Sequence, residues 1–154
     1  VTSLPKDSID KVYPYLALFY LGKNRVNRRI QEGLMKPTHT QIQTLDRIKN
    51  LAIEAFKPLI VGDIDRLAYL LSKGWDLKKK SNNVTTESID KIYEIGVGGG
   101  AMAGKLLGSG GGGHFLFLVD PENREGLIGA IETAGAKYVP FHLDYEGLRT
   151  GKKE

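Results

Sequence analysis

The sequence predicts an α+β fold, in which helices cover one side of a small sheet. Two observations support this fold class. Residues 15–21 and 115–119 are apolar runs with the length of buried strands. The segments around them carry apolar residues at the three- to four-residue spacing of helices that bury one face. The expected order is strand, several helices, strand, helix, strand, and a chain of 154 residues favours a single domain over residues 1–154.

Composition limits the compartment and the partners. With 41% hydrophobic and 26% charged residues the chain is expected to fold. It has no cysteine, which excludes disulfides and thiolate metal sites and fits a reducing, cytoplasmic compartment. A net charge of +4, spread along the chain, favours solvated lysines over a nucleic-acid surface. No stretch approaches the ~20 apolar residues that cross a membrane. Because Val1 is not a natural start, we expect a piece of a longer protein.

The first strand is expected to begin at about Tyr15, after Pro14, and to end at Gly22. The basic cluster at residues 23–29 then begins a helix capped by Asn24. Arginines in this cluster can receive a phosphate or a carboxylate, and Arg25, nearest the strand end, is the best candidate.

Three helices follow. The first comes after the break at residues 37–40 and ends at Pro58. The second begins at about Asp63 and carries Trp75, which we interpret as a core anchor. The third is capped within residues 85–88. Their expected apolar positions are Ile42, Leu45, Ile48 or Lys49, Ala52 and Phe56; Ile64, Leu67, Leu71 and Trp75; and Ile89, Ile92, Tyr93 and Ile95.

The remaining elements surround the glycine-rich stretch. Residues 101–107 are predicted to form a short helix, and residues 115–119 a buried strand. A helix then begins at Asp120, with Pro121 in its first turn, and stops at Gly135. Residues 137–143 form the last strand.

Glycine is concentrated in one place: ten of residues 96–113 are glycine, against 19 in the whole chain. A P-loop matches residues 99–105, but Leu106 stands where Ser or Thr must hold Mg²⁺. A dinucleotide fingerprint fits residues 96–101, but Gly108 cuts the following helix short. The third interpretation is a short helix, a glycine turn that can bind an anion, and a buried strand.

Residues 100–115 resemble the third, C-terminal motif of the GHMP kinases, the superfamily of galactokinase, homoserine kinase, mevalonate kinase and phosphomevalonate kinase. Residues 18–25 look like the strand and turn that open the C-terminal domain in its sugar-kinase members. Residues 75–79 resemble their Trp-x-Leu-Lys segment. The D-glycero-D-manno-heptose-phosphate kinase branch is the nearest match. Leu21, Ser109 and His114 depart from the usual residues.

The resemblance implies a ferredoxin-like sandwich with a small antiparallel sheet, forming the C-terminal half of an ATP-dependent kinase for a sugar or sugar phosphate. The family's nucleotide loop, Pro-x-x-x-Gly-Leu-x-Ser-Ser, does not occur in this sequence. ATP, Mg²⁺ and the catalytic acid are therefore expected mainly on an N-terminal domain, and this chain alone should be inactive. A non-catalytic ligand-binding or regulatory module and, less favoured, a dinucleotide-binding domain are the alternatives.

The expected site binds the substrate or the nucleotide and contains no catalytic residue or metal ligand. Its partners are a sugar phosphate and ATP, with no nucleic acid and no membrane, and homodimer formation is left open. His39, His114 and His142 are interpreted as structural, because no other ligand stands at metal-binding spacing. The site residues are Gly108, Ser109, Gly110, Gly111, Gly112, Gly113, Lys105, Arg25 and Lys23.

Overall fold

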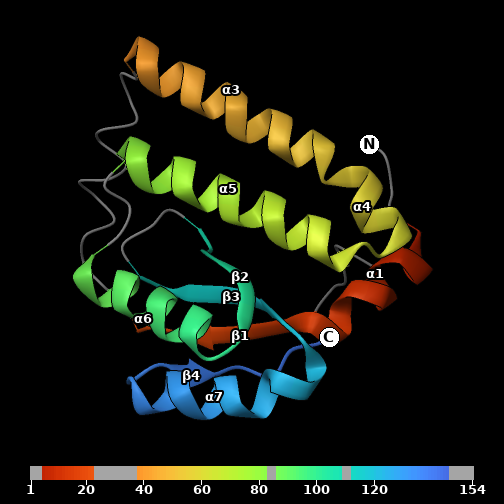
Figure 1. Cartoon of the computed structure of the whole chain (residues 1–154), viewed down its shortest axis with the longest axis vertical. Coiled ribbons are helices and arrows are strands. Elements are labelled where there is room, and N and C mark those ends of the chain that lie inside the picture. Colours follow the sequence, from red (N-terminus) through yellow and green to blue (C-terminus); the bar gives the residue numbers. More distant parts are fainter. Residues whose placement is uncertain (1–4, 23–37, 83–85, 109–111, 146–154) are drawn as a thin grey trace, which may run out of the picture.

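The computed structural model describes residues 5–22, 38–82, 86–108 and 112–145. In these parts the chain forms one four-stranded sheet flanked by helices (Figure 1). The helices are α1 (Lys6–Val12), α3 (His39–Glu54), α4 (Phe56–Val61), α5 (Ile64–Asn82), α6 (Glu87–Gly98) and α7 (Arg124–Thr133), with 3₁₀ turns η1 (Tyr13–Tyr15) and η2 (Pro121–Asn123). The strands are β1 (Leu16–Tyr20), β2 (Ala101–Leu106), β3 (His114–Val119) and β4 (Lys137–Tyr138).

The sheet confirms the predicted fold class. Its strand order is β2-β3-β1-β4, and every neighbouring pair is antiparallel. The connections β1 to β2 and β3 to β4 each skip one strand, which is the split βαβ arrangement of ferredoxin-like folds. Helices α6 and α7, which precede β2 and β4, cover the same face of the sheet (Figure 1). The apolar runs that predict strands form β1 and β3, the two central strands.

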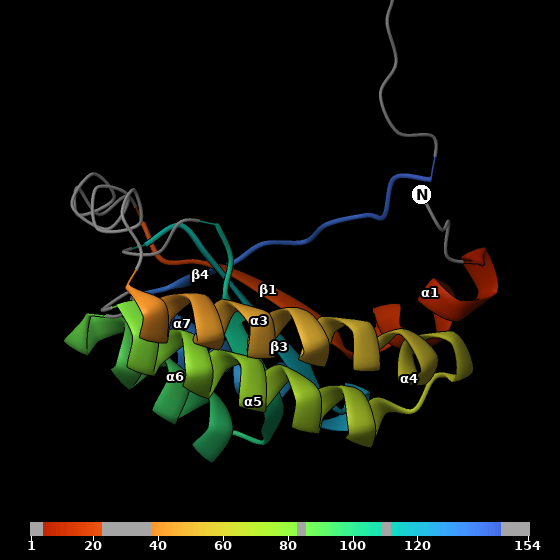
Figure 2. The ribbon, with the colours of Figure 1, turned by 90° about the horizontal axis from the view of Figure 1, so that it is seen from above.

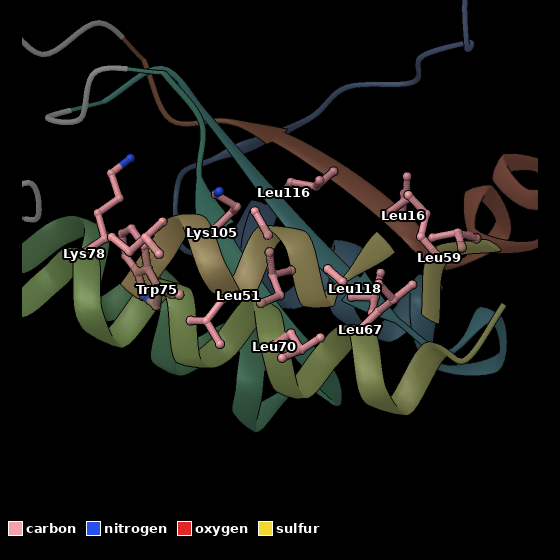
Figure 3. A pocket seen from close by; sticks show the side chains of 16 residues that line it. Leu16, Leu51, Leu59, Leu67, Leu70, Trp75, Lys78, Lys105, Leu116 and Leu118 are labelled. Carbon is pink, nitrogen blue, oxygen red and sulfur yellow. The ribbon is translucent and has the colours of Figure 1, made fainter. Parts of the chain in front are cut away.

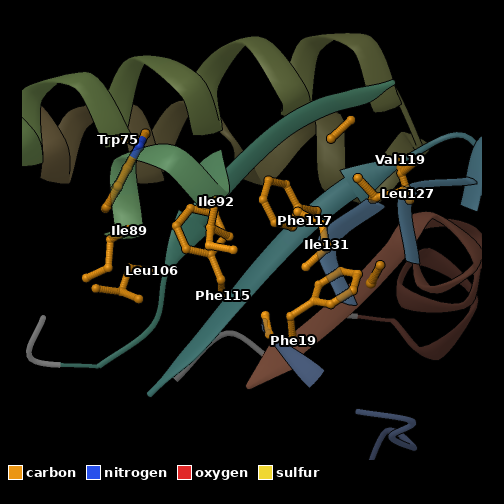
Figure 4. Packing of buried hydrophobic residues seen from close by; sticks show 13 residues of the cluster. Phe19, Trp75, Ile89, Ile92, Leu106, Phe115, Phe117, Val119, Leu127 and Ile131 are labelled. Carbon is orange, nitrogen blue, oxygen red and sulfur yellow. The ribbon is translucent and has the colours of Figure 1, made fainter. Parts of the chain in front are cut away.

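The main core lies between this face and the two helices (Figure 4). Phe19, Phe115 and Phe117 have no exposed surface, and the Phe115 and Phe117 rings stack with their centroids 4.6 Å apart. Trp75 reaches the same cluster from α5 and meets Phe115 edge to face at 5.5 Å. Only 1% of Trp75 is exposed, so its predicted role as a core anchor is confirmed.

Helix α5 packs along the edge strand β2, with α3 beside it (Figure 1 and Figure 2). Its Leu67 and Leu71 form a second, smaller cluster with Leu16 and Leu118 of the opposite face. Side chains alternate along a strand, and the register places Leu16 opposite Leu118 and Leu116 opposite Lys105 on this second face. Helix α3 packs against α5 and α4, yet none of its residues is buried. The second face is therefore less completely closed than the first.

The prediction of a helix at residues 101–107 is wrong, because residues 101–106 form strand β2. Gly100, at a φ of 94°, turns the chain out of α6. Gly104 then lies across the core rings, where a Cβ atom would stand 2.6 Å from Phe117. Ala and Leu favour helices, but pairing with β3 and close packing under the rings override that local preference.

The assignment of β2 also excludes the P-loop and the dinucleotide fingerprint. The glycines at residues 96–100 lie at the end of helix α6 and ahead of a strand. A P-loop and a dinucleotide fingerprint each need the reverse order, a strand followed by a helix. Gly96 has a packing role instead, because a Cβ atom there would lie 2.3 Å from the Phe117 ring.

Two further boundaries differ from prediction, and one helix was not expected. The first long helix ends at Glu54, and Pro58 stands in the first turn of α4, where a missing N–H breaks no helical bond. The last strand is two residues long, because Val139 still donates to Leu18 but Pro140 has no donor. Helix α1 was not predicted. The helix expected at Asn24 lies outside the described residues.

Candidate functional site

The glycine turn joins β2 to β3, and backbone hydrogen bonds hold both of its described ends. Leu107 N donates to His114 O at 2.8 Å, which continues the β2–β3 ladder. Gly113 N donates to Gly22 O at 3.0 Å, and Leu21 N donates to Gly113 O at 2.8 Å. The turn is thus fixed against the end of β1. Of the predicted site residues, Ser109, Gly110 and Gly111 lie outside the described part of the chain.

The described glycines of the turn are needed for their backbone angles. Gly108 has a φ of 78° and Gly113 a φ of 98°, in the left-handed region that favours glycine. A Cβ atom at either position would meet nothing within 4 Å, so space is not the reason for glycine here. Gly112 also has a positive φ, 142°. This contrasts with Gly96 and Gly104, which are glycines because of close packing.

Two lysines stand beside the turn. Lys105, predicted from the sequence, lies on the second face of the sheet in β2. Lys78, on α5, donates from Nζ to the carbonyl oxygen of Gly108 at 3.4 Å. Sequence reasoning missed Lys78 as a site residue, although it is the lysine of the Trp-x-Leu-Lys segment. Figure 3 shows both ammonium groups at the same end of one cavity.

Burial and like charge act on Lys78. Its partial burial, and secondly the positive charge of Lys105, lower the pKa of the Lys78 ammonium from the ordinary value of 10.5. Among the described residues no carboxylate pairs with either lysine; the ion pairs there are Lys49–Asp46 and Arg66–Glu54. Two adjacent cations without a carboxylate partner favour an anionic ligand, whose charge would offset their repulsion.

The remaining predicted cations, Lys23 and Arg25, lie outside the described residues. Their place along the chain is nevertheless informative, because Gly22, which precedes Lys23, is hydrogen-bonded to Gly113 of the turn. The described chain therefore ends, after β1, beside the glycine turn at Gly22.

A cavity of about 360 Å³ extends from the two lysines between α3, α4, α5 and the second face of the sheet (Figure 3). Apart from Lys78 and Lys105, its walls carry no charged side chain. They are formed by Val12, Leu16, Ile48, Leu51, Ala52, Ala55, Leu59, Leu67, Leu70, Leu71, Gly74, Trp75, Leu116 and Leu118.

The donor set suits a phosphate and not a metal ion. Backbone amides of a glycine turn and lysine ammonium groups bind phosphate oxygens, whereas Mg²⁺ needs oxygen ligands such as carboxylates. Within the described ranges no three His, Cys, Asp or Glu side chains are placed to hold a metal ion. His114 is exposed and its ring lies 5.1 Å from that of Tyr20. These residues therefore do not fit a Mg²⁺ site, but they do fit a phosphate of a nucleotide or sugar.

Comparison with known families agrees with this arrangement. Residues 52–137 match the family model described as GHMP kinases C terminal. The chain belongs to the GHMP kinase family. The match includes Lys78, Lys105 and the glycine turn.

The relatives of this GHMP kinase chain are longer than it is. A D-glycero-alpha-D-manno-heptose 7-phosphate kinase from Campylobacter jejuni is 32% identical over 110 residues, covering 71% of this chain and 32% of the relative. A D-glycero-D-manno-heptose 1-phosphate kinase structure from Bacteriodes thetaiotaomicron has a TM-score of 0.58 at 24% identity, covering 90% of this chain and 36% of that one. The chain thus spans about a third of the length of these relatives.

The same fold occurs in the crystal structure of the Methanococcus jannaschii mevalonate kinase. Its TM-score is 0.68 at 24% identity, covering 80% of this chain and 38% of that one. This likeness establishes the ferredoxin-like fold of the domain. In the described part of the chain, no helix is both long enough and apolar enough to span a bilayer.

Proposed function

We propose that this chain is the substrate-side, C-terminal half of an ATP-dependent kinase that phosphorylates a sugar or a sugar phosphate. The observation that carries the proposal is the pair of cations, Lys78 and Lys105, beside a glycine turn in a GHMP kinase domain. The similarity to a relative named as a heptose 7-phosphate kinase favours a sugar phosphate as the acceptor.

Each part of the turn has a chemical role in this proposal. In phosphoryl transfer, catalysis consists mainly of positioning and of donors directed at the charge on the moving group. The amides of residues 108–113, which include Ser109, Gly110, Gly111 and Gly112, approach the phosphate oxygens. Lys105 and Lys78 add positive charge. Lys23 and Arg25 hold the phosphate already present on the acceptor.

The rest of the reaction needs residues that this site lacks. ATP supplies the transferred phosphoryl group, and Mg²⁺ neutralises its charge when both are bound. We assign both mainly to an N-terminal domain, together with the catalytic acid, so that the 154-residue chain alone is inactive. The lack of cysteine favours a cytoplasmic location. Formation of a homodimer stays a prediction.

The test uses the complete coding sequence around this chain. A Pro-x-x-x-Gly-Leu-x-Ser-Ser loop is expected upstream of Val1, and the encoded protein should release ADP in the presence of ATP, Mg²⁺ and a heptose phosphate. Lys105→Met is expected to lower kcat/KM by about 100-fold, as loss of a preorganised donor does. Lys80→Met, an exposed position on α5, is the matched control and should stay within about twofold.

Two results would count against the proposal. The first is a complete protein that turns over ATP with no sugar or sugar phosphate. The second is a Lys105→Met variant that folds normally and keeps the activity of the Lys80→Met control. An upstream sequence without the nucleotide loop favours a non-catalytic ligand-binding module.

A further inference from the structure

We propose that the cavity between α3, α5 and the sheet binds a single-chain amphiphile, with its anionic head on Lys78 and Lys105 and its alkyl chain among the leucines. The binding does not depend on the kinase function proposed above. The two sites share their cations, however, so such a ligand and the phosphate of a substrate should exclude one another.

The lining of the cavity selects an alkyl chain over a sugar. Of its 16 wall residues, 14 offer only aliphatic, aromatic or glycine surface, and the other two are the lysines. A sugar placed there would bury several hydroxyl groups without hydrogen-bond partners, which is unfavourable. The volume of about 360 Å³ falls within the range of small-molecule sites. The acceptor sugar of the proposed reaction therefore binds elsewhere, outside this cavity.

The cavity is elongated and charged at one end. Its wall on α5 extends from Leu67 to Lys78, eleven residues along a helix, which corresponds to about 16 Å. Both ammonium groups lie at one end of this length, and the leucines Leu67, Leu59 and Leu16 lie toward the other (Figure 3). An elongated apolar site with cations at one end matches an unbranched chain that carries one anionic head.

The charge at that end has no carboxylate partner among the described residues. Lys78 is partly buried beside Lys105; its burial, and secondly the charge of Lys105, lower the pKa of Lys78. An anionic head would relieve the repulsion, and its attraction would be stronger in this half-buried position than at the open surface. Neutral alkyl compounds would leave the repulsion in place.

The experiment uses the 154-residue chain, whose single tryptophan, Trp75, lines the cavity and reports its occupancy by fluorescence. The chain is titrated with decyl phosphate below its micelle concentration, with decanol and with inorganic phosphate. Isothermal titration calorimetry gives an independent affinity. Decyl phosphate is expected to bind at least about tenfold more tightly than either decanol or phosphate.

Variants distinguish the contribution of the anionic head to binding from that of the alkyl chain. Lys78→Met with Lys105→Met should weaken decyl phosphate by about tenfold or more and leave decanol unchanged. Ala52→Phe adds a ring at the exposed rim of the cavity and should weaken binding of decyl phosphate while both lysines remain. Lys80→Met is the control for charge. Circular dichroism checks that each variant is folded.

Several outcomes would overturn the proposal. If inorganic phosphate binds as tightly as decyl phosphate, the alkyl chain contributes nothing and the site binds only a phosphate. If decanol binds as tightly as decyl phosphate, the lysines have no role in binding. Binding only to anionic vesicles would indicate a membrane surface. If the complete protein does not bind decyl phosphate while this chain does, another part of the protein fills the cavity.

The test of the kinase function is separate. A complete protein without kinase activity in every assay would refute the proposed function and leave the amphiphile result standing.

Discussion

At the scale of single residues, glycine has two distinct roles in this chain. Gly96 and Gly104 touch the core rings so closely that a Cβ atom at either would overlap Phe117. Gly108 and Gly113 face open space and are glycines because of their positive φ. Sequence reasoning assigned residues 108–113 to ligand approach but found no packing role for Gly96 or Gly104, because glycine density alone cannot separate a packed glycine from a turn glycine.

Because Gly104 packs against the core rings, replacing it with a larger residue should lower the stability of the fold. In Gly104→Ala the new Cβ atom would lie 2.6 Å from Phe117 and 2.7 Å from Phe115, so the core must shift. We expect the free energy of unfolding in urea to fall by about 1–3 kcal/mol. The matched control is Gly126→Ala on α7, which meets nothing within 4 Å and should raise stability by about 0.5–1 kcal/mol. Equal effects at both positions would contradict the packing role.

A second prediction at this scale concerns Lys78. Because its pKa in the folded chain is lowered below 10.5, the unfolded chain binds the proton more tightly. Stability should then rise with pH between the lowered value and 10.5, as the ammonium loses its proton. Lys78→Met is expected to remove this rise and to increase the free energy of unfolding near neutral pH, since an unfavourable partly buried charge is lost.

Urea unfolding at about pH 7 and about pH 10 measures both effects, with Lys80→Met as the control. Should Lys78→Met lower stability at neutral pH, the contact with Gly108 would outweigh the repulsion from Lys105. A folding gain combined with a loss of anion binding is the pattern expected of a residue kept for function.

At the scale of elements, α3 is the least securely attached helix among those described. It has a capping box, in which Thr38 accepts from Gln41 N and donates to the Gln41 side chain, but none of its residues is buried. Several of its apolar side chains are strongly exposed, including Ile42, Leu45 and Ile53. Local stability follows buried apolar contact, so α3 should open independently of the core.

Hydrogen exchange tests this expectation. Amide protons of α3 should exchange at least about tenfold faster than those of α6, whose Ile89 and Ile92 are buried. Thr38→Ala removes the side-chain cap and should raise exchange in α3 further, with a local cost of about 1 kcal/mol. Thr86→Ala, at the cap of α6, should instead reduce global stability. Uniform exchange across both helices would show that α3 is part of the main cooperative unit.

The elements also show where sequence patterns are sufficient. The runs that form β1 and β3 were predicted because central strands bury many of their residues, which concentrates apolar side chains in short runs. Helices α5 and α6 were predicted from their periodic apolar faces. Strand β2 was missed, because Ala101, Ala103 and Lys105 are compatible with a helix locally. Its pairing with β3 is decided by contacts that only the folded sheet provides.

At the scale of the whole molecule, the site depends on contacts between distant segments. Lys78 and Gly108 are 30 residues apart, and α5 must pack along strand β2 before they meet. Lys105 could be predicted because it stands in the glycine-rich motif itself. Lys78 was visible only as part of the Trp-x-Leu-Lys segment, and nothing in that pattern places it beside the turn.

The whole-molecule prediction follows from the position of the cavity between two layers. A ligand that contacts α3, α5 and the sheet should tie α3 to the core. At decyl phosphate concentrations 100 times Kd, the free energy of unfolding should rise by about 2.7 kcal/mol. Exchange should slow in α3, while the amides of α7, on the far face of the sheet, gain only the global increase. Leu51 and Ala52 of α3 form part of the cavity wall. If decyl phosphate raises the free energy of unfolding without slowing hydrogen exchange in α3, the ligand binds outside this cavity.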